Sequence, residues 1–141
     1  MKLIYFLPCR QVIVSNDGTV SLITVLENIN VNIQQQEPNE SSKPVIVPMA
    51  WELITQWQYE PDDREDEYLQ KIEIVHPDGT LWSTIESTIP PPNQEIYCRN
   101  IVKFMGLSVA QSGEMLVKLF LKKQLSKDWQ IISKYSLFIR H

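Results

Sequence analysis

Hydrophobic and polar residues alternate with a period of two along most of this chain, and short turn-forming segments interrupt the alternation. Successive side chains of a β-strand point to opposite faces, so this period is typical of strands with one buried face. No window of helical length carries apolar residues at the spacing of an amphipathic helix. The pattern therefore predicts an all-β protein.

Two Asp-Gly-Thr turns predict two hairpins. Predicted strands over residues 3–14 and 19–29 flank the first turn, and predicted strands over 68–75 and 81–88 flank the second. Asn, Asp and Gly tolerate the positive φ angles that a tight hairpin turn requires. Each pair of segments is therefore expected to form an antiparallel hairpin.

Four further strands are predicted over residues 47–59, 95–109, 114–123 and 129–140. The first of them is expected to bury one face and to leave the other, with Glu52, Ile54, Gln56 and Gln58, mostly in water. Its buried face carries Met49, Trp51, Leu53, Thr55, Trp57 and Tyr59. In the other three, the residues predicted to share a face are Ile101, Lys103, Met105, Leu107 and Val109; Met115, Val117, Leu119 and Leu121; and Trp129, Ile131, Tyr135, Leu137 and Ile139.

About eight strands joined by short turns, with wholly apolar inward faces, predict an antiparallel β-sandwich of the immunoglobulin-like or C2-like kind. A closed barrel is the alternative. The chain has 141 residues, 43% of them hydrophobic, which suits one domain over 1–141. Its two long connections are a polar loop at 32–44 and an acidic loop at 60–67.

Charge and cysteine content narrow the function classes. A net charge of −4 disfavours a nucleic-acid binder, because such proteins usually carry a basic excess. The two cysteines exclude a disulfide scaffold, and with His76 and His141 they lack the spacing of a zinc site.

The apolar start of the chain ends at Pro8, too early for a signal peptide, and no segment is long enough to span a membrane. We therefore expect a cytoplasmic protein with free thiols.

The order of these segments resembles a family of uncharacterised small bacterial all-β proteins, a domain of unknown function. The resemblance rests on a first strand ending in a cysteine, the two turn regions and a late strand pair, with sequences 5–9, 17–23, 25–29, 75–79, 104–109 and 113–117. This chain differs at Ile23-Thr24-Val25, where a glycine is more usual, and its acidic insertion is longer. The resemblance implies a β-sandwich, no known activity and no catalytic residue.

Charged residues gather in two segments. The acidic loop 60–67 holds six carboxylates and one arginine, a local charge of −5, whereas the segment from Lys118 to His141 carries +5. Calcium binding by the loop would need further ligands such as Asp17 or Asp78, and the loop lacks a recognised calcium motif, so we expect a solvated loop. On separate edges, the two charged segments could steer head-to-tail contact between copies, or the lysines could protect a sheet edge from pairing.

The four tryptophans raise the alternative of a carbohydrate-binding surface, because sugars stack on exposed aromatic rings. Trp51, Trp57 and Trp129 lie on the alternating faces that are expected to be buried, so we assign them to the core. Trp82 is out of phase with Leu81, so it is expected either to be exposed or to serve the second face of its strand. Trp82 is thus the main candidate for stacking on a sugar.

Candidate catalytic residues are few. His76 precedes Pro77-Asp78-Gly79, a pair suited to acid and base work, but a turn explains the same residues. Cys9 and Cys98 lack a neighbouring histidine or basic cluster, so buried structural thiols are expected. We predict no enzyme, no catalytic residue, no metal and no cofactor.

These observations favour a non-catalytic binding or structural-interaction module that acts through protein–protein contacts, with self-association as one form of such contact. The alternative is a ligand-binding β-sandwich for carbohydrate or calcium that uses Trp82, the acidic loop or both. Neither nucleic acid nor membrane is expected as a partner.

Overall fold

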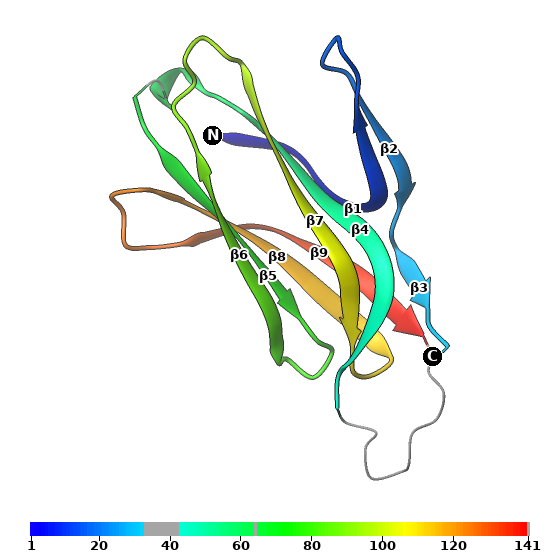
Figure 1. Ribbon diagram of the computed structural model, residues 1–141. Helices are drawn as coiled ribbons and strands as arrows, with labels where there is room; N and C mark the ends of the chain where they lie inside the picture. The colour runs from blue at the N-terminus through cyan, green and yellow to red at the C-terminus, as the bar shows by residue number, and fades with distance from the viewer. Residues whose placement is uncertain (33–42, 64, 141) are drawn as a thin grey trace.

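The computed structural model describes residues 1–32, 43–63 and 65–140, and it forms two β-sheets packed face to face (Figure 1). The first sheet has the strand order β2-β1-β4-β7 and the second β3-β9-β8-β5-β6. The strands in this part of the chain are β1 (Lys2–Val14), β2 (Val20–Val25), β3 (Asn28–Asn30), β4 (Val45–Gln58), β5 (Tyr68–Val75), β6 (Leu81–Ile89), β7 (Tyr97–Val109), β8 (Gly113–Lys123) and β9 (Gln130–Arg140). The predicted β-sandwich is confirmed, and the sheets do not close into a barrel.

The described strands differ from the prediction in number and in direction. The segment 19–29 was expected to be one strand, but it divides into β2 in the first sheet and β3 in the second. β3 runs parallel to β9, so the sandwich is not wholly antiparallel as predicted. Most of the predicted polar loop 32–44 lies outside the described residues.

The hydrophobic core lies between the two sheets, as the alternation predicts. Trp51, Leu53 and Trp57 of β4 are buried, and Tyr59 packs against the same core. Facing them, β8 contributes the predicted series Met115, Val117, Leu119 and Leu121, all of them buried. The expected core faces of β4 and β8 are therefore confirmed.

The inward faces are not wholly apolar, which corrects the prediction. Gln70 of β5 is buried between the sheets, and its Oε1 accepts a hydrogen bond of 2.8 Å from Trp57 Nε1 and another of 2.8 Å from Thr55 Oγ1. Trp57 and Thr55 belong to β4, in the other sheet. One buried amide oxygen therefore joins the two sheets through directional bonds, and we call this group the inter-sheet bridge.

The β1–β2 hairpin lies over the outer face of the four-stranded sheet (Figure 1). The first half of β1 pairs with β4 as far as Cys9↔Glu52, and the second half pairs with β2. The Glu52 carboxylate then accepts the Val12 N–H, and the Arg99 guanidinium donates to the Gly18 carbonyl over 3.2 Å. This cover buries Glu52 and Ile54, so the prediction that their face is mostly in water is wrong.

Two predicted faces are wrong because the strands contain irregularities. The β8–β9 register shifts between Leu119 and Phe120, where β9 contains an extra residue. As a result, Ile131 points to the outer face of the sheet, whereas Leu137 points into the core. The β4–β7 register shifts between Pro48 and Trp51. Across that shift, Met105 is 84% exposed, whereas Leu107 is fully buried. A bulge of this kind reverses the phase of everything beyond it.

Thr24 adopts a positive φ of 54° within β2. The left-handed region costs a side-chain-bearing residue about 1–2 kcal/mol, and β-branched residues are the least suited to it. Glycine relieves this cost but loses about 0.5–1 kcal/mol more through backbone entropy on folding, so we expect Thr24→Gly to raise the free energy of unfolding by a net of about 1 kcal/mol. Urea denaturation checks this, and a lower stability of the variant would contradict it.

Candidate functional site

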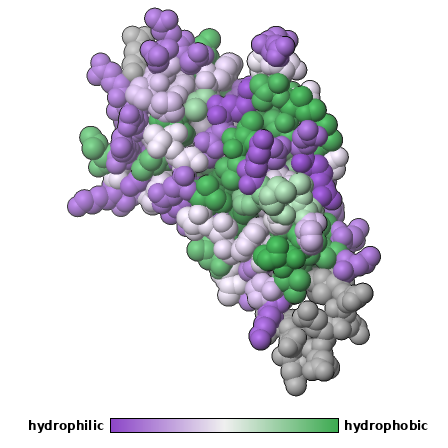
Figure 2. All heavy atoms as spheres, in the orientation of Figure 1, coloured by the Kyte–Doolittle hydropathy of each residue, from purple (hydrophilic) through white to green (hydrophobic). Residues whose placement is uncertain are grey.

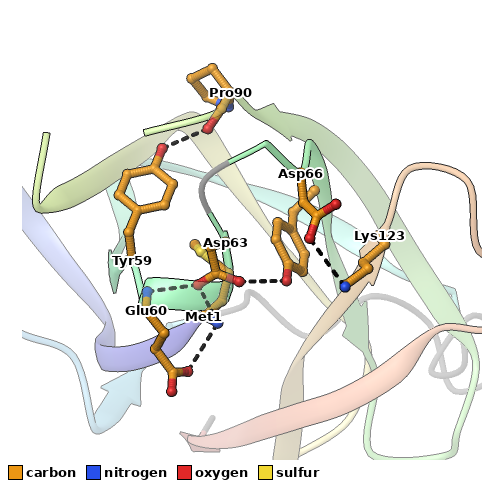
Figure 3. A network of polar contacts seen from close by, with 8 residues as sticks. Met1, Tyr59, Glu60, Asp63, Asp66, Pro90 and Lys123 are labelled. Atoms are coloured by element: carbon orange, nitrogen blue, oxygen red, sulfur yellow. Dashed lines mark hydrogen bonds and ion pairs between the residues drawn. The ribbon is translucent and has the colours of Figure 1, made fainter. Parts of the chain in front are cut away.

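The acidic loop is anchored by a buried aspartate (Figure 3). Asp63 is 3% exposed, and its Oδ2 lies 2.7 Å from the Met1 α-amino group and accepts the Glu60 N–H over 2.7 Å. The Tyr68 hydroxyl donates to the other oxygen over 2.6 Å, and the Glu60 carboxylate lies 3.0 Å from the same amino group. The prediction of a merely solvated loop is therefore wrong for Asp63, which binds the first residue of the chain.

Asp63 and the Met1 amino group each stabilise the charged form of the other. Burial alone would raise the pKa of Asp63, but hydrogen bonds from the Met1 amino group, Tyr68 and the Glu60 backbone outweigh it and lower the pKa. Burial would likewise lower the pKa of the Met1 amino group, yet Asp63 and Glu60 raise it. Both groups are thereby held in their charged forms at neutral pH.

The acidic loop and the basic segment meet at one end of the sandwich rather than on separate edges. Lys123 Nζ lies 3.1 Å from an Asp66 carboxylate oxygen, and Gln124 N–H donates to the Glu67 carbonyl over 2.9 Å. This contact joins the loop to the β8–β9 turn (Figure 3). Part of each charge is thus neutralised within one molecule, which weakens the electrostatic argument for head-to-tail contact.

The four tryptophans fall into two groups. Trp51 and Trp57 lie in the core as predicted, and Trp51 stacks on Phe104 with ring centroids 4.3 Å apart. Trp82 is half-buried and packs against this pair, with its ring 6.0 Å from Phe104. The β5–β6 register is irregular at this point, which turns Trp82 toward the core while Leu81 stays exposed.

Trp129 is not a core residue, which corrects the prediction. It lies just before β9, half-buried on the outer face of the five-stranded sheet. Lys71 Nζ lies 4.7 Å from the centre of its ring and 4.6 Å from the ring of Phe120, and Lys122 Nζ lies 5.0 Å from Trp129. Trp129 is therefore covered by lysines of its own chain through cation–π contacts, rather than presented as a free platform.

His76 lies beside a serine at the edge of a small pocket. Its Nε2 is 3.2 Å from Ser108 Oγ, and both residues are buried. The pocket has a volume of about 360 Å³ and is also lined by Trp82, Asp78 and Thr80. The Asp78 carboxylate is engaged by Thr80 and by the Gln111 amide, while His76 Nδ1 has no hydrogen-bond partner.

This arrangement brings His76, Asp78 and a serine together, which the sequence pattern did not predict for Ser108. A serine nucleophile needs an exposed hydroxyl and a histidine oriented by a third group. Ser108 is 2% exposed, and the carboxylate of Asp78 bonds to its own turn rather than to His76. The geometry therefore provides a polar pocket wall and not an assembled catalytic triad.

Both cysteines are free and protected. Cys9 is fully buried and Cys98 is half-buried. Burial, with the nearby Glu52 charge, raises the pKa of Cys9. Burial also raises the pKa of Cys98, against a smaller opposing effect of a hydrogen bond with Tyr59. Both thiols are thus held in the protonated, weakly nucleophilic form.

An apolar surface lies on one face of the β1–β2 hairpin, and we call its three residues the hairpin patch: Ile13, Ile23 and Val25. Their side chains are 41%, 42% and 39% exposed. Figure 2 shows apolar atoms gathered over this hairpin, below its polar tip. The sequence signal was the richness of both strands in β-branched residues, but the sequence did not reveal that one face would stay uncovered.

Two exposed cations lie close to the β1–β2 hairpin. Arg10 lies between Cys9 and Gln11 on β1, so its side chain points to the face opposite the hairpin patch. Lys103 Nζ lies 3.8 Å from the Glu52 carboxylate that also binds the Val12 N–H.

Within the described ranges, no group of three or more His, Cys, Asp or Glu side chains is arranged to hold a metal ion. In the same ranges, no helix has the length and apolar character needed to cross a membrane.

Comparisons with known proteins do not assign a family. No family profile matches the chain, and no curated protein matches it. Among solved structures, it is similar to the crystal structure of the C-terminal domain of wzt, with a TM-score of 0.39 and 13% identity over 67% of this chain. The similar region spans 61% of that domain, less than two thirds of its length. At this TM-score the likeness carries no argument about function.

Proposed function

We propose that this protein is a non-catalytic binding module that contacts a protein partner through the hairpin patch. The observation that carries the proposal is the exposure of three β-branched side chains on one face of the hairpin. Exposed apolar surface that is contiguous and bordered by polar groups is typical of protein interaction sites.

A site-specific photocrosslink in the native host tests this proposal. A photoreactive residue at position 23 should give an adduct of defined mass with another protein, whereas the same residue at position 134, on the outer face of β9, should give none. Added wild-type protein should suppress the adduct, because it competes for the partner.

A matched pair of competitors makes the test specific. Ile23 is 42% exposed and Ile131 of the other sheet is 49% exposed. Ile23→Ser protein should compete at least tenfold less well than wild type, a loss of about 1.4 kcal/mol, and Ile131→Ser protein should compete normally. Absence of an adduct at position 23, or equal competition by both variants, would overturn the proposal.

A second candidate is the binding of a small sugar in the pocket beside Trp82. The observation in its favour is that an indole ring and the polar side chains of His76, Asp78 and Thr80 line one hollow. A sugar that binds only the native state must raise the melting temperature. Thermal melts with a glycan panel should show a rise in melting temperature that Trp82→Ala removes, and no rise with any glycan would end this candidate.

The same melts with calcium and with EDTA test whether the acidic loop binds a cation.

A further inference from the structure

The sandwich has several free strand edges in its described part, and most of them carry a feature that opposes pairing with another strand. β2 contains the positive φ of Thr24, and β3 has only three residues. β7 carries Arg99 and Lys103 and lies opposite an irregular register, and the uncovered half of β9 has a bulge and Lys134. Bulges, short strands and lysines are the usual means of protecting an edge.

The outer edge of β6 has almost none of these protections. β6 is the last strand of the five-stranded sheet and pairs only with β5. From Ser83 to Ile89 its register with β5 is regular, and it contains no lysine, proline or glycine. Its one charged residue is Glu86. A regular edge of this length offers a row of backbone N–H and C=O groups to an incoming strand.

The sequence of β6 is nearly symmetric about Ile85. In an antiparallel pair of identical strands centred there, Ile85 lies opposite Ile85 of the second copy, Ser83 opposite Ser87, and Thr84 opposite Glu86. Directly opposite residues share a face, so the apolar residues meet and no like charges face each other. A centre at Glu86 would instead place two carboxylates opposite one another, which is destabilising.

We propose that β6 pairs with β6 of a second copy of this chain, antiparallel and centred on Ile85, to form one continuous sheet across a two-fold axis. Such an isologous contact uses the same strand twice and closes after two copies. The interface lies on the other sheet from the hairpin patch, so it goes beyond the proposed function. The two tests have separate readouts.

A charge swap tests both the contact and its register by sedimentation equilibrium. Thr84→Glu places a carboxylate opposite Glu86 of the other copy twice in each dimer, so the dissociation constant of the dimer should rise about tenfold. The double variant Thr84→Glu with Glu86→Lys turns both contacts into attractive pairs, and its dissociation constant should return to within about twofold of wild type.

Thr88→Glu is the matched control. It adds the same charge on the same exposed face, but in the proposed register position 88 lies beyond the regular stretch that begins at Ser83 and faces no charged residue of the other copy, so the dimer should be unchanged within about twofold. Circular-dichroism melts confirm that every variant is folded. A wild-type protein that remains monomeric up to about 1 mM would overturn the proposal. Equal weakening by both single variants, or no recovery in the double variant, would do the same.

Discussion

Replacing Gln70 with methionine is expected to lower the free energy of unfolding by about 2–4 kcal/mol. The substitution keeps the length of the side chain but removes the acceptor of the inter-sheet bridge. The indole N–H of Trp57 and the hydroxyl of Thr55 would then be buried without their 2.8 Å partner. Urea denaturation monitored by tryptophan fluorescence measures the loss, with an unchanged m-value as the sign that the fold persists.

A double-mutant cycle separates the hydrogen bond from the packing. Trp57→Phe removes the indole donor, so in its background the Gln70→Met substitution leaves one fewer buried group unpaired. The double variant should therefore be about 1 kcal/mol more stable than the sum of the single effects predicts. Strict additivity would show that the bond between Trp57 and Gln70 contributes nothing.

Asp63→Asn is expected to destabilise the protein by about 2–4 kcal/mol near pH 6, because it removes the charge that faces the buried Met1 amino group. The asparagine oxygen can still accept the Tyr68 hydroxyl, so the loss reports on the two partners of the other oxygen, the Met1 amino group and the Glu60 N–H. Asp66→Asn is the control: Asp66 pairs with Lys123 in a more exposed setting. The control substitution should cost less than about 1 kcal/mol.

The pH dependence of stability gives a second measurement of the same group. The pKa of Asp63 is lowered on folding, so its contribution is present above the unfolded value of about 4 and is lost as pH falls through the folded value. The pKa of the Met1 amino group is raised, so its contribution is present below about pH 8 and is lost as pH rises through the folded value. Wild type should therefore lose stability on both flanks, and Asp63→Asn should flatten both.

The fold class follows from the sequence because a period of two needs only local information. The errors arise where one inserted residue reverses that period, as just after Ile131 and near Met105, and a bulge has no reliable sequence signal. Buried polar groups were missed for another reason. Gln70 and Asp63 look solvent-exposed in sequence, and only the fold brings them to Trp57 and to Met1.

The candidate surfaces were harder to predict than the fold. The richness of the β1–β2 hairpin in β-branched residues is visible in the sequence, but its position over Ile54 depends on where β1 leaves β4. The phase of Trp82 along its strand predicts its exceptional position, whereas the position of Trp129 depends on Lys71 and Lys122. Side chains that interact across separate strands cannot be paired from spacing alone.

The continuity of β1 has a mechanical consequence for binding. One uninterrupted strand belongs to the main sheet in its first half and to the hairpin in its second, and the changeover lies at the fully buried Cys9. The hairpin therefore has no flexible hinge at its base, and a ligand that engages it meets a preorganised arm. Little conformational entropy is lost on such an encounter, and strain applied at the tip passes directly into the sandwich.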